Sequence, residues 1–171
     1  MNIEVYPLEK IVIDGVSIDL GMKRADVEDA IGTGAYEKTN DRYYYYHNEL
    51  AISYVADKVD FIEFLGGIDG FLRPTVYGVS VFDTPADEVA ELLKQKNGGE
   101  REDKERGCFL TFSNISVGVY RSLTPSSVTE MIEEMKANGI PTENNADVEA
   151  DERRANHWET MGIGVGGYYR R

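Results

Sequence analysis

Two stretches of the chain begin alike, and their repetition constrains the fold more than any other feature. GVSIDLGMKRADVEDAIG starts at Gly15, and GVSVFDTPADEVAELLKQ starts at Gly78. Each stretch passes from an alternating, strand-like run into a pattern that places apolar residues on one side of a helix. Each then leads into short alternating runs of the kind that form antiparallel hairpins. The sequence therefore predicts an α+β fold made of tandem helix plus antiparallel-hairpin repeats.

The first unit is expected to contain a hairpin, a short helix and three further strands. Asp14-Gly15 is a dipeptide that tolerates the positive φ angles of a tight turn. Gly32 can end the helix that starts near Met22. The runs RYYYYH, ELAISYV and KVDFIEFL follow, separated by turn-forming residues, and are typical of strands.

The second unit carries a better-marked helix and a second hairpin. Thr84 can cap the helix, Pro85 suits its first turn, and Gly98 can close its C-terminus. CFLTF and ISVGVYR then predict two strands around a turn at Ser113-Asn114.

The remaining residues predict one more helix, a loop and a last strand. Apolar residues between Thr124 and Gly139 recur at the spacing of a core-facing helix. PTENNADVEADERRAN has almost no large apolar residue and is interpreted as a solvated connection, and HWETMGIGVGGYYR predicts a terminal strand. We expect two repeats, residues 1–73 and 74–171, packed as one compact unit whose sheet is covered by helices on one face.

This order of elements, from about residue 11 to residue 121, resembles the tandem-repeat fold of beta-lactamase-inhibitor-protein-like domains. The resemblance rests on the two stretches quoted above and on the hairpins that follow them. In that family, helices pack on one side of an antiparallel sheet, and the other side is a concave surface that binds proteins. The chain lacks the cysteine pairs and the secretion signal of the secreted inhibitors, which argues against beta-lactamase itself as the target.

The charge of the chain argues against several classes of partner, and its cysteine count excludes two kinds of covalent or metal site. The chain has 31 acidic and 18 basic residues, and its formal charge of -13 repels nucleic acid and anionic membrane surfaces. The same charge favours encounter with a basic protein. Cys108 is the only cysteine, so neither an intramolecular disulfide nor a four-thiolate zinc site is possible. No stretch approaches the ~20 apolar residues of a membrane span, and we expect a cytoplasmic protein.

The chain carries no convincing catalytic, metal-binding or cofactor-binding motif. GIGVGG matches G-x-G-x-x-G, but no helix is expected after it, as dinucleotide binding requires. Its alternating glycines are expected to leave a bare strip on one face of the last strand. His47 and His157 have no second histidine nearby, and the acidic run NNADVEADE lacks the glycine of a calcium loop. Cys108 lies in a strand pattern and is interpreted as a small buried residue rather than a nucleophile.

Four consecutive tyrosines, Tyr43 to Tyr46, predict a strand with two different faces. A two-residue turn at Asn48-Glu49 would pair Tyr45 with Ile52 and Tyr44 with Ser53. Tyr43 and Tyr45 would then face the core, while Tyr44 and Tyr46 would face outward.

The same reasoning places further aromatic side chains on the outward face. A turn at Ser113-Asn114 would pair Phe112 with Ile115 and Leu110 with Val117, which turns Phe109 and Tyr120 outward. In the last strand, Trp158 shares its side with Gly162. Tyrosine and tryptophan are frequent at binding hot spots. The predicted partner-binding residues are Tyr44, Tyr46, Phe109, Tyr120 and Trp158.

We therefore hypothesise a non-catalytic protein-binding module, such as an inhibitor or an immunity protein, that docks through this aromatic face. The rival hypothesis is a small-ligand-binding protein or an enzyme that uses the same face as a pocket, with Asp and Glu side chains or His157 beside Trp158. Two further alternatives stay open. The aromatic face could mediate homo-oligomer formation, or it could be covered by the segment from Asn138 to Asn156.

Overall fold

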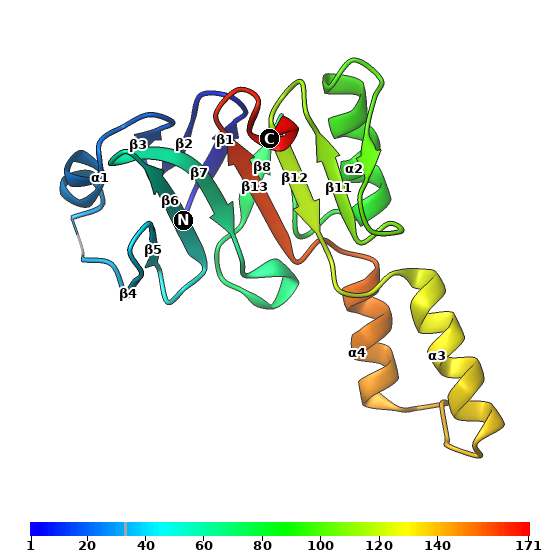
Figure 1. The fold of residues 1–171 in the computed structure, drawn as a ribbon. Helices are drawn as coiled ribbons and strands as arrows, with labels where there is room; N and C mark the ends of the chain where they lie inside the picture. Colours follow the sequence, from blue (N-terminus) through cyan, green and yellow to red (C-terminus); the bar gives the residue numbers. More distant parts are fainter. Residues whose placement is uncertain (33) are drawn as a thin grey trace.

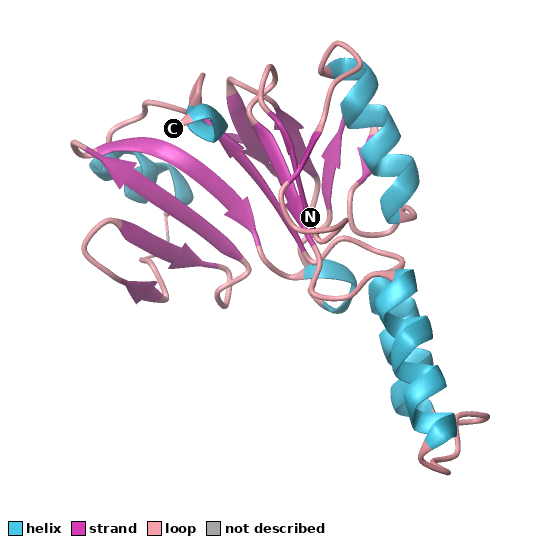
Figure 2. Ribbon diagram, turned by 45° about the vertical axis from the view of Figure 1, so that its right-hand side comes forward, coloured by secondary structure: helices cyan, strands magenta, loops and turns pink. Residues whose placement is uncertain are grey.

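The computed structural model describes residues 1–32 and 34–171. Over these residues the chain forms two β-sheets, four α-helices and two short 3-10 turns, which confirms the α+β class. The two sheets pack face to face, and two of the helices extend away from them (Figures 1 and 2).

The smaller sheet has five strands in the order β3-β2-β1-β8-β9. Its strands are β1 (Ile3–Tyr6), β2 (Lys10–Ile13), β3 (Val16–Asp19), β8 (Pro74–Val76) and β9 (Val79–Ser80). β1 runs parallel to β8, and the other pairs are antiparallel hairpins. This sheet therefore joins the two ends of the first 80 residues.

The larger sheet has eight antiparallel strands in the order β10-β11-β12-β13-β7-β6-β5-β4. Its strands are β4 (Glu37–Lys38), β5 (Arg42–Tyr45), β6 (Leu50–Val55), β7 (Lys58–Phe64), β10 (Glu102–Asp103), β11 (Phe109–Phe112), β12 (Val117–Tyr120) and β13 (Thr160–Gly164). β7 and β13 pair at its centre.

The helices are α1 (Arg24–Ile31), α2 (Ala86–Lys96), α3 (Pro125–Ala137) and α4 (Ala146–Ala155), and the 3-10 turns are η1 (Gly67–Asp69) and η2 (Tyr168–Arg170). One succession of elements occurs twice along the chain: a hairpin, a helix, then four strands of the large sheet, with α3 and α4 lying between the third and fourth strands of the second occurrence. The predicted boundary between residues 73 and 74 falls at the start of the second succession and stays a prediction. None of the helices in the described residues has the length and apolar character needed to cross a membrane.

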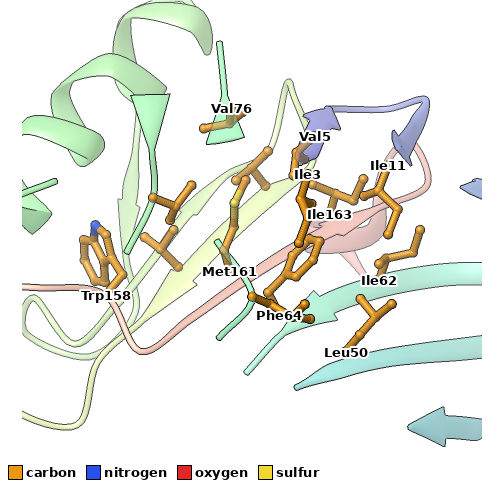
Figure 3. Packing of buried hydrophobic residues seen from close by; sticks show 14 of the residues in the cluster. Ile3, Val5, Ile11, Leu50, Ile62, Phe64, Val76, Trp158, Met161 and Ile163 are labelled. Carbon is orange, nitrogen blue, oxygen red and sulfur yellow. The ribbon is translucent and has the colours of Figure 1, made fainter. Parts of the chain in front are cut away.

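The core lies between the two sheets. Ile3 and Ile11 of the small sheet face Ile62, Met161 and Ile163 of the large one, and all five are at most 1% exposed (Figure 3). Each such side chain contributes about 1.5 to 3 kcal/mol when it is removed from water. The expectation that helices cover one face of the large sheet is therefore incomplete, because a second sheet covers its middle.

Both predicted hairpin turns are two residues too short. Tyr45 pairs with Leu50, and Phe112 pairs with Val117, so each turn holds four residues. In the first turn His47 and Asn48 have φ angles of 54° and 68°, in the left-handed region, which lets a longer loop close. Side chains alternate with a period of two, so a two-residue shift keeps every strand residue on its predicted face.

α3 and α4 form a helical hairpin, residues 125–155, that projects from the body (Figures 1 and 2). The interpretation of the 141–156 stretch as a solvated connection is wrong. Asn145 caps α4, because its side-chain oxygen accepts hydrogen bonds from the backbone N–H groups of Asp147 and Val148. α4 buries only Val148 and Ala155, since its partner is one helix rather than the core.

Neighbouring tyrosines in β5 should respond oppositely to truncation. Tyr45 is 1% exposed, so Tyr45→Ala should lower the free energy of unfolding by ~3 to 5 kcal/mol, the range for deleting a buried aromatic side chain. Tyr44 lies on the other side of the strand and is half-buried, and Tyr44→Ala should cost ~1 kcal/mol or less. Denaturant melts of both variants measure the difference, and equal losses would contradict it.

Candidate functional site

The open face is the side of the large sheet that points away from the small sheet. The strand registers place one continuous row of side chains across it. From edge to edge the row is Glu37, Tyr44, Ala51, Glu63, Gly162, Gly118, Thr111 and Glu102. Its fifth and sixth positions are Gly162 and Gly118, neighbours across β13 and β12, so neither of these strands contributes a side chain to the row where they pair.

Three glycines of this face form a floor on which aromatic rings pack directly. A Cβ atom added at Gly118, Gly162 or Gly164 would lie closer than 3.0 Å to the side chains of Tyr169, Phe61 and Tyr168, respectively. Real Cβ atoms essentially never show such distances. Gly162 and Gly164 share one face of the strand, as predicted, but the strip is not bare, because aromatic side chains cover it.

The rings above this floor form one cluster. Phe61 of β7 stacks on Tyr168, with ring centroids 4.4 Å apart and an interplanar angle of 6°. Tyr169 meets Tyr168 edge-on at 5.0 Å and approaches Phe109 of β11 at 6.4 Å. Such arrangements contribute about 0.5 to 1.5 kcal/mol per pair beyond area burial. The prediction that the terminal strand continues through GYYR is wrong, because β13 ends at Gly164 and the chain turns onto the open face.

Polar groups border the aromatic cluster. Arg42 forms an ion pair with Glu63 and donates hydrogen bonds of 3.1 Å to the hydroxyls of Tyr44 and Ser53. Thr160 donates to Glu63 at 3.3 Å. Burial works to lower the pKa of Arg42, but its hydrogen bond to Glu63 and the charge of that carboxylate more than offset burial, and the pKa is raised. Arg42 therefore stays a cation whose donors are already engaged.

Between these groups the open face has a hollow with a volume of about 490 Å³. The side chains that define the hollow include Arg42, Phe61, Glu63, Phe109, Tyr120 and Thr160. A larger hollow of about 730 Å³ borders on Tyr169 as well, but Tyr169 is the one aromatic side chain among its lining residues, which are mainly polar and charged. The smaller, aromatic hollow is therefore the candidate site.

Three of the five predicted residues lie on the open face. Tyr44 is half-buried beneath the guanidinium of Arg42, whose carbon lies 5.4 Å from the ring centroid. Phe109 and Tyr120 pair across β11 and β12, and both line the hollow. Tyr120 is 36% exposed, the most accessible of the three.

The other two predicted residues do not belong to this face. Tyr46 lies in the first turn with a φ angle of 52° and packs against the core, because the strand ends one residue before it. Trp158 is fully buried at the base of the helical hairpin, where its indole N–H donates a 2.9 Å hydrogen bond to the carbonyl of Ala86. Arg121 lies 4.8 Å from its ring and donates to the carbonyl of Ala155 at 2.8 Å. Trp158 is thus a structural residue of this junction.

Sequence reasoning did not identify Arg42, Phe61, Glu63, Tyr168 and Tyr169 as parts of the face. The alternation of KVDFIEFL puts Phe61 and Glu63 on one side, and this signal could have found them. Tyr168 and Tyr169 gave no such signal, because they lie in a 3-10 turn beyond the strand.

Among the residues that the structure describes, no group of three or more His, Cys, Asp and Glu side chains could hold a metal ion. Cys108 is half-buried just before β11, and the NNADVEADE run lies at the start of α4. The segment from Asn138 to Asn156 belongs mainly to the projecting helical hairpin rather than to a cover over the open face (Figure 2).

No known protein family, no curated protein and no solved structure matches this chain.

Two tyrosines with raised pKa values predict a loss of stability at alkaline pH. Burial raises the pKa of Tyr169, and the neighbouring Glu63 raises it further; burial also raises the pKa of Tyr54. On unfolding these hydroxyls ionise at their ordinary value of about 10, so their contribution is complete below about pH 10 and falls as the pH rises above it.

Denaturant melts between pH 8 and pH 11 should show this decline in the free energy of unfolding, at roughly 1.4 kcal/mol per pH unit for each such group at most. Tyr169→Phe keeps the ring and removes the ionisable hydroxyl, so its decline should be shallower. An identical slope in Tyr169→Phe and the native chain would contradict the role of Tyr169.

Proposed function

We propose that this protein is a non-catalytic binding module that docks another protein on the open face of its large sheet, as an inhibitor or an immunity protein does. The observation that carries the proposal is the aromatic hollow itself, which combines aromatic rings, among them the exposed ring of Tyr120, with charged groups that are already paired. A partner side chain entering it would gain aromatic contacts without leaving Arg42 or Glu63 unpaired.

The residue types suit docking. Aromatic side chains offer large contact areas with few rotatable bonds, and they dominate binding hot spots. Tyr120 adds a hydroxyl at the rim, and Phe109 adds an apolar wall. Thr160 and Glu63 supply polar groups to the lining of the hollow.

The charge of the chain favours a basic partner. A formal charge of -13 attracts cationic proteins and accelerates their encounter at low ionic strength. This attraction weakens as salt screens it, with a Debye length of about 8 Å at physiological ionic strength. We place the encounter in the cytoplasm, since the lone Cys108 provides no intramolecular disulfide.

The resemblance to beta-lactamase-inhibitor-protein-like domains belongs to the same proposal. A hairpin, a helix and four strands occur twice, and the two groups of four strands meet where β7 pairs with β13. We propose that the two successions are tandem repeats and that the open face corresponds to the protein-binding surface of that family. α3 and α4 are then an insertion in the second repeat, at the position where the first has only Ala56 and Asp57 between strands.

A small-ligand-binding protein is the second candidate. The hollow of about 490 Å³ has a size typical of ligand sites, and Arg42, Glu63 and Thr160 converge on it. The proposal of protein docking is preferred because the Arg42 and Glu63 side chains satisfy each other.

Docking predicts a partner whose retention depends on Tyr120 and on salt. The native chain, immobilised, should capture a protein from the lysate of its own cells at low salt and retain less at high salt. Tyr120→Ala should weaken capture by at least about tenfold, the effect of a hot-spot residue worth ~1.4 kcal/mol or more.

Tyr6→Ala is the matched control, because Tyr6 is 40% exposed but lies in β1 of the small sheet. It should capture as much partner as the native chain. If nothing is retained at either salt concentration, or if both variants capture equally, protein docking on the open face is contradicted.

The ligand-binding alternative predicts a thermal shift instead. A metabolite that binds the hollow should add ~2.7 kcal/mol to the free energy of unfolding at 100 times its dissociation constant. Under protein docking we expect no such stabilisation across a metabolite library. A metabolite that stabilises the native chain but not Tyr120→Ala would favour the ligand-binding function.

A further inference from the structure

One segment of the chain lies across the open face, and within the described part of the chain its backbone forms no hydrogen bond to the strands beneath it. We call residues 166–171 the strap. The last backbone hydrogen bond between this end of the chain and the sheet runs from Val165 to Asp60. The strap's own backbone bonds, from Tyr168 to Val165 and from Arg170 to Gly167, remain local to this end of the chain. Within the described residues, only side chains therefore hold the strap on the sheet.

The strap begins with two consecutive glycines. Gly166 and Gly167 lie side by side, and Gly167 has a φ angle of 83°. A Cβ atom at either position would meet nothing within 4 Å. Adjacent glycines in open space allow the backbone to rotate with little steric resistance. The strap can therefore swing away from the sheet while β13 stays paired.

The contacts beneath the strap form a shaped subsite. Tyr168 stacks on Phe61, and the Tyr169 ring reaches over Gly118. The guanidinium of Arg171 forms two hydrogen bonds, of 2.8 and 3.0 Å, to the carboxylate of Asp60. Asp60 is 9% exposed, so this carboxylate is a fixed feature of the face. The subsite thus accepts two adjacent aromatic rings and an arginine.

We propose that the strap is an internal occupant of the docking face, and that a partner protein displaces it with a segment of the same chemistry: adjacent aromatic side chains followed by arginine. This inference rests on the proposed function and deepens it by naming what the partner presents. The glycine floor takes the rings, Phe61 stacks on one of them, and Asp60 receives the guanidinium. The formal charge of -13 favours such an arginine-bearing partner.

Displacement of the strap has a measurable consequence. A tethered segment competes at an effective concentration in the millimolar range. An external segment binds only the fraction of molecules whose strap is lifted, so its apparent affinity is reduced by that fraction. Weakening the strap should therefore strengthen the binding of the external segment.

The test is a titration of the isotope-labelled full chain with the synthetic peptide GGYYRR, which corresponds to the strap. Two-dimensional amide spectra report on Gly118, Gly162 and Gly164, and the same spectra show whether each variant is folded. The native chain is compared with Tyr168→Ala/Tyr169→Ala. The milder variant Tyr168→Ala/Arg171→Ala, which removes a half-buried ring and an exposed cation, serves if the first one does not fold.

We expect the peptide to shift the three glycine signals of the strap variants at concentrations at least about tenfold lower than in the native chain. The control peptide GGAARR should not shift them. Gly118→Ala in the strap-variant background should abolish binding, because its Cβ atom takes the place of the tyrosine hydroxyl. Equal binding to native chain and variants, or no binding to any of them, overturns the inference.

Two further outcomes separate this inference from the proposed function. Capture of a partner that depends on Tyr120, without any peptide binding, would leave protein docking standing and overturn the role of the strap. Peptide binding without a captured partner would keep the subsite and contradict the docking function. A doubled mass of the native chain in solution that Tyr168→Ala removes would assign the subsite to a second copy, and would overturn a foreign segment as the occupant.

Discussion

The pairing of β7 with β13 is the interaction on which both sides of the large sheet depend. Ile62 lies opposite Ile163, and Phe64 lies opposite Met161, so this seam joins two groups of four strands. On the inner side its apolar residues meet the small sheet, as Figure 3 shows. On the open side the same two strands present Phe61, Gly162 and Gly164. The core and the candidate docking face are therefore two sides of one pair of strands.

The glycines of the open face illustrate a conflict between stability and site geometry. A glycine in a strand interior costs roughly 0.5 to 1 kcal/mol relative to alanine, because the unfolded chain has more conformational freedom to lose. Gly118, Gly162 and Gly164 lie in β12 and β13, two interior strands of the large sheet, so this cost applies to each of them. The aromatic contacts of Phe61, Tyr168 and Tyr169, which a Cβ atom would prevent, offset it.

Local alternation predicted the faces of the strands, and it could not predict what depends on distant segments. RYYYYH assigned Tyr45 to the core although the turn was misjudged by two residues, because a shift of two preserves the side. The end of β5 before Tyr46 depends on the left-handed conformation of Tyr46 itself, which is uncommon for such a residue and which the run RYYYYH does not signal. The burial of Trp158 depends on α2 and Arg121, which are remote in sequence, and the parallel pairing of β1 with β8 joins residues about 70 positions apart.

The helical hairpin and the strap leave the large sheet in different directions, and this difference decides which of them can control the open face. The hairpin is anchored through buried groups, the indole of Trp158 and the guanidinium of Arg121, and projects away from the sheets (Figure 1). The strap is attached by side chains above a glycine joint and lies on the face itself. Opening the hairpin would disrupt buried polar contacts, at a cost of about 1 to 3 kcal/mol for each group left unpaired. Under the proposed docking function, lifting the strap would expose rings and a carboxylate that a partner would cover again, so the strap, rather than the hairpin, would control access to the open face.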